Sequence, residues 1–67
     1  MIIAKFLGIE CDSPSELATM LEDFGTKQTV KFFRDESLLF SKIYIPAKHD
    51  AYYFGVDFFA EAEALHL

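Results

Sequence analysis

Residues 13–25, SPSELATMLEDFG, constrain the fold most strongly because they specify a helix with both of its ends defined. Ser13 suits the N-cap, Pro14 suits the first helical position, and Glu16 stands where a capping box needs it. Four apolar residues follow at the spacing of one helical face: Leu17, Met20, Leu21 and Phe24. Gly25 comes next, where a left-handed cap is favoured. We predict an amphipathic helix over about 14–24, which must pack its apolar face on another element.

The segments on either side of this helix have the composition of strands. Residues 2–10 are rich in Ile, Phe and Leu, and are apolar on both alternating faces. Residues 27–34 and 38–45 predict an antiparallel hairpin, with a tight turn at residues 35–36 and Pro46 as the stop. A strand–helix–strand start would allow the first two strands to be parallel.

Residues 51–58, AYYFGVDF, alternate in a way that predicts a fourth strand, with Tyr52, Phe54, Val56 and Phe58 on one side. The alternative is one long helix over residues 50–66 that starts at Asp50. Gly55 and three consecutive aromatic residues argue against that helix. The tail beyond Phe58 is rich in Ala and Glu, and we predict a short C-terminal helix there.

These elements predict the order β-α-β-β-β with a short C-terminal helix. The fold class is α+β, a two-layer domain in which a small, largely antiparallel sheet of three to four strands carries the helix over about 14–24 on one face. Residues 1–67 form a single domain, because the chain of 67 residues is too short for two.

A lone cysteine, Cys11, permits no disulfide framework and no cysteine-based zinc site, which indicates a reducing compartment such as the cytoplasm. The N-terminus lacks the pattern of a signal peptide, and no apolar run approaches the length of a membrane span. We therefore interpret the chain as a complete gene product outside the membrane, with no cofactor.

The supply of apolar side chains exceeds what one helix on one sheet face can bury. Twenty-seven residues are Ile, Leu, Val, Met, Phe or Tyr, and the helix with the sheet face beneath it accounts for about 16 of them. We assign part of the surplus to the second sheet face and predict a partner-binding surface there: Phe33, Phe40, Tyr44 and Tyr53, with Lys31 and Lys42 between them. Two alternatives stay open, a C-terminal helix that covers this face through Phe59, Ala62 and Leu65, and single-stranded nucleic acid.

Charge is unevenly distributed along the chain. The net charge of −5 divides into −4 for residues 1–25, +3 for residues 26–48 and −4 for residues 49–67. The overall acidity opposes direct binding of a nucleic acid. An acidic surface is predicted from eight carboxylates: Glu10, Asp12, Glu16, Glu22, Asp23, Asp57, Glu61 and Glu63. This surface serves solubility in one interpretation, and imitates nucleic-acid phosphates in another.

Catalytic residues are not recognisable in this sequence. Cys11 precedes a helix N-terminus, where the helix dipole can lower the pKa of a thiol. A nucleophile also needs a base, and the two histidines, His49 and His66, lie far along the chain from it. Their separation matches no metal-ligand spacing, and we interpret His49 as a polar cap of a loop.

We therefore expect a small, acidic, non-enzymatic protein-interaction module. It would bind and modulate or inhibit a larger protein, as phage- or plasmid-encoded inhibitors and antitoxins do, and would form a homodimer. The alternative is a nucleic-acid-directed role, either as an acidic mimic or as a single-strand binder that uses the basic, aromatic hairpin.

Overall fold

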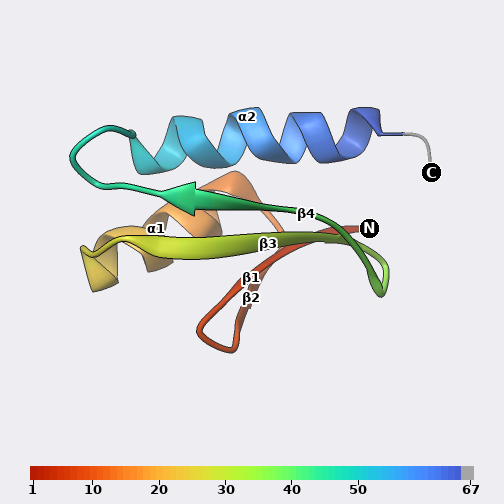
Figure 1. Ribbon diagram of the computed structural model, residues 1–67, viewed down its shortest axis with the longest axis horizontal. Helices are drawn as coiled ribbons and strands as arrows, with labels where there is room; N and C mark the ends of the chain where they lie inside the picture. Colours follow the sequence, from red (N-terminus) through yellow and green to blue (C-terminus); the bar gives the residue numbers. More distant parts are fainter. Residues whose placement is uncertain (66–67) are drawn as a thin grey trace.

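A computed structural model describes residues 1–65 of the chain, which form a four-stranded sheet and two helices (Figure 1). The elements follow in the order β-β-α-β-β-α. Their bounds are β1 Ile2–Phe6, β2 Ile9–Cys11, α1 Pro14–Phe24, β3 Gln28–Arg34, β4 Ser37–Tyr44 and α2 Ala51–Ala64. The predicted α+β class is confirmed, while the order of the elements differs from the prediction at two places.

The first difference is that residues 2–10 are a hairpin and not one strand. β1 and β2 pair antiparallel through a turn at Leu7 and Gly8, whose φ angles are 50° and 77°. Two consecutive positive φ angles are what a tight hairpin turn requires, and Gly8 adopts its angle without a steric penalty. β1 then pairs with β3 in antiparallel fashion, so the option of parallel first strands was wrong.

The second hairpin, β3 and β4, follows the prediction within one residue at each end. Asp35 turns the chain with a φ of 55°, and the two strands pair from Gln28–Tyr44 at one end to Arg34–Ser37 at the other. The register shifts at one irregularity between Phe32 and Phe33. The sheet order is β2-β1-β3-β4 with antiparallel pairing throughout.

Helix α1 has the predicted bounds and the predicted caps. The Ser13 hydroxyl accepts a hydrogen bond from the Glu16 backbone N–H at 3.2 Å, and the Glu16 carboxylate accepts one from the Asp12 N–H at 3.1 Å. Gly25 ends the helix with a φ of 65° and donates its N–H to the Leu21 carbonyl. These contacts satisfy backbone groups that a helix terminus leaves without partners.

The second difference is that residues 51–58 are helical, so the predicted fourth strand was wrong. Helix α2 starts after Asp50, whose carboxylate accepts a hydrogen bond from the Tyr53 N–H at 3.1 Å. Its buried residues have helical spacing: Ala51, Phe54, Gly55, Phe59 and Ala62. The alternative of one helix starting at Asp50 is confirmed, and it ends at Ala64.

Gly55, which argued against a helix in the sequence, is the point where the two helices meet. A Cβ atom on Gly55 would lie 3.1 Å from the Cα of Pro14, which is tighter than ordinary van der Waals contact. The absence of a side chain therefore lets α2 approach the first turn of α1. The packing that this close approach allows outweighs the low helix propensity of glycine.

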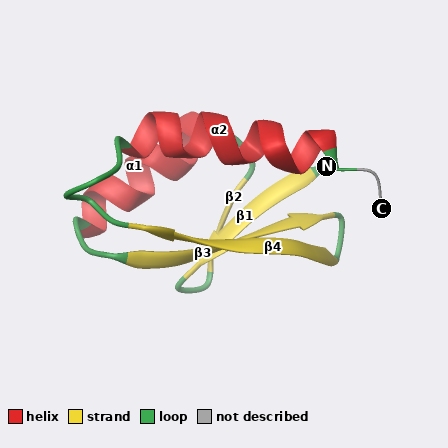
Figure 2. Cartoon of the chain, turned by 45° about the horizontal axis from the view of Figure 1, so that its top comes forward, coloured by secondary structure: helices red, strands yellow, loops and turns green. Residues whose placement is uncertain are grey.

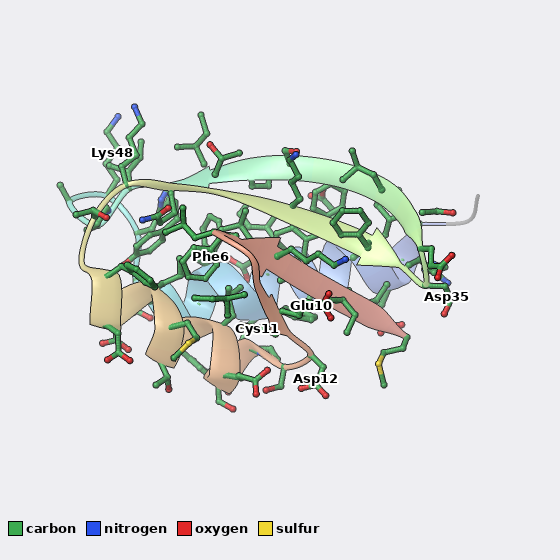
Figure 3. All side chains as sticks on the ribbon, turned by 90° about the horizontal axis from the view of Figure 1, so that it is seen from below. Phe6, Glu10, Cys11, Asp12, Asp35 and Lys48 are labelled. Carbon is green, nitrogen blue, oxygen red and sulfur yellow. The ribbon has the colours of Figure 1, made fainter. Side chains whose placement is uncertain are left out.

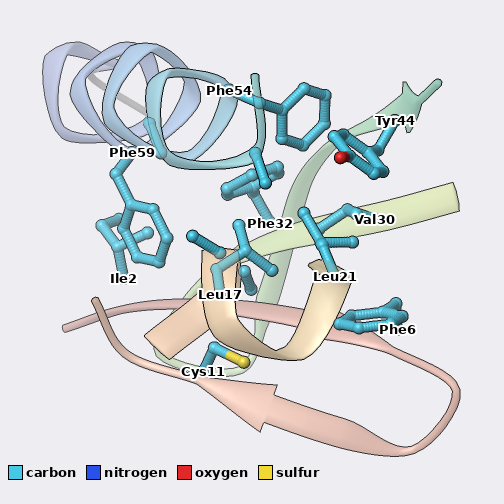
Figure 4. Close-up of a cluster of buried hydrophobic side chains, with 14 residues drawn as sticks. Ile2, Phe6, Cys11, Leu17, Leu21, Val30, Phe32, Tyr44, Phe54 and Phe59 are labelled. Carbon is cyan, nitrogen blue, oxygen red and sulfur yellow. The ribbon is translucent and has the colours of Figure 1, made fainter. Parts of the chain in front are cut away.

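Both helices lie on the same face of the sheet (Figure 2). Between the sheet and the helices lies one apolar core, to which every element contributes (Figure 4). Phe32 is fully buried there, with the rings of Phe40 and Phe59 at 5.2 and 5.5 Å between centroids. The alternative in which the C-terminal helix covers the second face of the sheet was wrong, because α2 packs beside α1.

Arg34 fastens the end of α2 to the sheet. One of its terminal nitrogens, Nη2, donates to the carbonyls of Ala62, Glu63 and Leu65 at 2.8, 3.2 and 3.0 Å. Carbonyls in the last turn of a helix lack partners inside the helix, and a cation stabilises that end of the helix dipole. Arg34 therefore holds α2 over the same face that α1 covers.

Candidate interaction surface

Because both helices cover one face, the other face of the sheet carries no layer of residues 1–65. Side chains alternate between the faces, and directly paired residues share a face. We call this surface the open face and define it by nine residues: Ile3, Lys5, Glu10, Thr29, Lys31, Phe33, Leu38, Ser41 and Ile43. In Figure 3, which views the molecule from below, α2 lies behind the sheet and α1 lies beside it.

An apolar row crosses the open face from β1 to β4. Ile3 pairs with Phe33, and Phe33 pairs with Leu38. Leu38 is 53% exposed, and Ile43, which pairs with Thr29, is 50% exposed. Ile3 and Phe33 are half-buried, and Ser41 separates Leu38 from Ile43 on this face. Apolar side chains gathered on one uncovered face are the usual sign of an interaction surface.

A charged row runs beside the apolar one. Lys5 and Lys31 are directly opposed across β1 and β3, and Glu10 is opposed to Lys5 on the other side. The Lys5 ammonium lies 3.2 Å from the Glu10 carboxylate and 4.7 Å from the centre of the Phe33 ring. No carboxylate within residues 1–65 is at ion-pair distance from Lys31.

The two rows border a shallow hollow of about 310 Å³ near the β1–β2 turn. Its lining includes Leu7, Gly8 and Thr29, together with Lys5, Lys31 and Phe33. Leu7 is held at the rim by the turn and is among the exposed apolar residues. The hollow is thus lined by apolar residues together with two lysines and one threonine.

The six residues predicted to bind a partner do not share one surface. Lys31 and Phe33 are on the open face, as predicted. Phe40 and Tyr44 are on the side of the helices: the Phe40 and Phe58 rings are 6.3 Å apart, and Tyr44 is 4% exposed. The predicted placement of these two rings was wrong because the alternating side chains of β4 point to the faces opposite to those predicted.

Lys42 and Tyr53 were also placed wrongly. Lys42 turns toward α2, with its ammonium 3.8 Å from the Glu61 carboxylate and 5.0 Å from the centre of the Phe58 ring. Tyr53 belongs to α2 and points outward from it, 63% exposed. The predicted position of Tyr53 depended on a fourth strand that the chain does not form.

Six open-face residues belong to neither predicted surface and were missed in the sequence: Ile3, Lys5, Thr29, Leu38, Ser41 and Ile43. Lys5 carried a usable signal, because a single lysine inside the apolar run of residues 2–10 marks the side of the strand that faces water. Leu38 carried none, since the register irregularity in the β3–β4 hairpin places it on the opposite face from the one that strict alternation with Phe40 would give.

The predicted acidic residues lie mostly on the helical layer, opposite the open face. Glu16, Glu22, Asp23, Asp57, Glu61 and Glu63 are exposed on the two helices. Asp12 precedes α1, and Glu10 is the one member of the set on the open face. The lysine pair and most of the predicted carboxylates therefore lie on opposite sides of the molecule.

The candidate nucleophile Cys11 is sealed in the core. It is 0% exposed, and burial, with the nearby carboxylates of Glu16 and Asp12, raises the pKa of its thiol. His49 is engaged in the loop, where its Nδ1 atom accepts a hydrogen bond from the Ile45 N–H at 3.0 Å, so its interpretation as a loop cap is confirmed. His66 lies outside the described residues. Residues 1–65 contain no cluster of three or more potential metal ligands.

Comparison of this chain with protein-family models, curated proteins and solved structures finds no match. Within residues 1–65, neither helix combines the length and the apolar character needed to cross a membrane.

Proposed function

We propose that this chain is a small, non-enzymatic interaction protein that binds a larger protein through its open face and modulates or inhibits it. The observation that carries the proposal is an apolar surface on the face that no helix of residues 1–65 covers. It consists of Ile3, Phe33, Leu38 and Ile43, of which Leu38 and Ile43 are exposed. Water contact at these side chains is unfavourable by roughly 25 cal/mol for each Å² of apolar surface, and a partner would remove it.

A protein partner fits this surface better than stacked nucleotides do. Of the three strand aromatics predicted to face a ligand, only Phe33 is on the open face, whereas Phe40 and Tyr44 pack toward the helices. Single-strand binding depends on several aromatic rings in one groove. The remaining open-face apolar groups are aliphatic, which suits the side chains of another protein.

Homodimerisation is the second part of the proposal, and we assign it to the edge of the sheet. Two open faces in contact would set one lysine pair against another, which is unfavourable. β4 offers a separate surface, because it is the outer strand of the sheet and presents eight residues of backbone for antiparallel pairing. Pairing of two β4 strands would join the sheets and leave both open faces accessible.

We propose the class of phage- or plasmid-encoded inhibitors and antitoxins for this chain, with its acidity as the support. A cytoplasmic location is proposed with it. Its support is the single cysteine, held as a buried free thiol, which suits a reducing compartment.

The decisive experiment compares capture of a partner from the native host lysate by three immobilised proteins. We expect the original protein to retain a partner and Leu38→Ser/Ile43→Ser to lose it. The control Tyr52→Ser/Tyr53→Ser removes equally exposed apolar groups from α2 and should retain the partner. Capture by the first variant but not by the second would contradict the proposal.

Dimerisation is checked separately by sedimentation equilibrium. A mass of twice 7.7 kDa is expected, and Ser41→Pro in the middle of β4 should reduce it to that of the monomer by removing a backbone donor. A monomer at all concentrations would contradict the dimer without touching the open-face proposal.

A further inference from the structure

The direct opposition of two lysines on the open face is unfavourable for the folded chain, although Lys5 also contacts Glu10 and Phe33. Lys5 and Lys31 are direct partners in the β1–β3 register. Like charges at directly opposed positions destabilise a sheet, whereas a Thr or Glu at either position would stabilise it. A local like-charge conflict that lowers stability is characteristic of a functional site.

The lysine pair is only partly neutralised by its neighbours. Glu10 provides one carboxylate at 3.2 Å from Lys5, and the Phe33 ring provides a cation–π contact to the same ammonium. Lys31 is exposed, and no carboxylate of residues 1–65 reaches it. Among these three charged groups one positive charge remains, on a molecule whose net charge is −5.

The hollow beside the lysines adds a second element of recognition. Its volume of about 310 Å³ is bounded by Leu7, Thr29 and Phe33 together with the lysines. A space of this kind can hold an apolar side chain, while the two ammonium groups at its margin attract a carboxylate. The two features therefore match a ligand in which an acidic residue is next to an apolar one.

We propose that the lysine pair is a binding site for a carboxylate of the protein partner. The partner segment is acidic and apolar in alternation, and lies with its Asp or Glu between Lys5 and Lys31 and with an apolar side chain in the hollow. This inference rests on the proposed function, whose surface it shares, and it specifies the chemistry of the partner.

A carboxylate suits this site better than the phosphates of a nucleic acid. One uncompensated positive charge matches one carboxylate, whereas a polyanion would also be repelled by the net charge of the whole molecule. The aliphatic neighbours Ile3, Leu38 and Ile43 favour peptide side chains. Charge complementarity thus selects an acidic protein segment.

The inference is tested by titrating ¹⁵N-labelled protein with a five-residue probe peptide, capped at both ends, of sequence Glu-Leu-Glu-Phe-Glu. We expect backbone signals of Lys5, Thr29, Lys31 and Phe33 to shift, and signals of α2 to stay in place. The same peptide with lysine in place of glutamate should cause no shift. Two further arms use a ten-residue oligothymidylate and inorganic phosphate, which should not shift these signals either.

Lys31→Glu should weaken binding of the acidic probe by about fivefold or more, because it replaces an attraction with a repulsion. Lys48→Glu makes the same change of net charge in the loop between β4 and α2 and should leave binding unchanged. Because Lys31→Glu also removes the repulsion with Lys5, the melting temperature of this variant should rise. A raised melting temperature would show that weakened binding does not result from misfolding.

The remaining outcomes overturn the inference. If Lys31→Glu binds the probe as tightly as the original protein does, the lysine pair is not the site. If oligothymidylate shifts the open-face signals and the acidic peptide does not, the ligand is a nucleic acid. If Lys31→Glu binds the probe normally while Leu38→Ser/Ile43→Ser loses the partner in the lysate experiment, the proposed function stands and this site does not. If Lys31→Glu binds the probe normally and Leu38→Ser/Ile43→Ser retains the partner, both the site and the proposed function are contradicted.

Discussion

Phe32 and Phe33 are neighbours in the chain and occupy opposite faces of the sheet. Phe32 is fully buried beneath the helices, in contact with the rings of Phe40, Phe58 and Phe59. Phe33 lies on the open face, where the Lys5 ammonium is over its ring. The comparison shows that the face, and not the residue type, decides whether an aromatic ring stabilises the fold or remains available to a partner.

The largest effect is expected when the two phenylalanines are truncated one at a time. Phe32→Ala should lower the free energy of unfolding by about 3–5 kcal/mol, because it leaves a cavity in the core. Phe33→Ala should lower it by less than about 1 kcal/mol, since little packing is lost at a surface position. Urea denaturation followed by circular dichroism measures both.

Equal losses in the two variants would contradict the division of the sheet into a covered and an open face. A domain of this size has a small total stability, so Phe32→Ala can fail to fold altogether. Phe32→Leu then gives a measurable value, and its loss should still exceed that of Phe33→Leu.

The second prediction tests what holds both helices on the covered face. Gly55→Val should lower the free energy of unfolding by about 1–3 kcal/mol, because the new side chain would overlap the backbone of Pro14 and force the helices apart. Ala60→Val is the control, at an exposed position of the same helix. It should cost less than about 1 kcal/mol through helix propensity alone. Thermal unfolding distinguishes the two, and equal costs would show that the helices do not meet at Gly55.

The third prediction concerns how a charge change on the open face alters the free energy of unfolding. Lys31→Glu should raise it by roughly 0.2–1 kcal/mol, because an attractive pair with Lys5 replaces a repulsive one. Lys48→Glu should change it by less, and added salt should reduce the gain. A loss of stability in Lys31→Glu would mean that the two ammonium groups do not repel each other in the folded protein.

The smallest expected effect is a pH dependence of the free energy of unfolding, which arises from Cys11 on the covered face. Burial raises the pKa of the Cys11 thiol above 9.0, and the nearby carboxylates add to the shift. Its contribution to stability is therefore fully present below pH 9 and is lost as the pH rises through the folded pKa. Urea denaturation at several pH values above 8 should show a decline, and Cys11→Ala should make it shallower. An equally steep decline in Cys11→Ala would contradict the assignment.

Local sequence signals predicted the elements that are stabilised locally. The helix Pro14–Phe24 carries its own caps and a clear apolar face, and its bounds were predicted correctly. The β3–β4 hairpin carries its own turn at Asp35. Neither depends on distant residues for its type, so both could be recognised from the chain alone.

The errors occurred where distant contacts decide the structure. Residues 51–58 alternate like a strand, yet helical spacing from Ala51 to Ala62 fits the space beside α1, and Gly55 permits the close contact with Pro14. The turn at Leu7 was missed because a leucine with positive φ is uncommon. Once these two segments change type, the assignment of residues to the open face changes with them.

We propose that the partner contacts the face of the sheet that the helices leave open. Site-specific photo-crosslinking checks this contact, with benzoylphenylalanine in place of Phe33 in one protein and in place of Tyr53 in another. In host lysate we predict an adduct with a partner protein from position 33 and none from position 53. An adduct from position 53 alone would place binding on α2 and contradict the account.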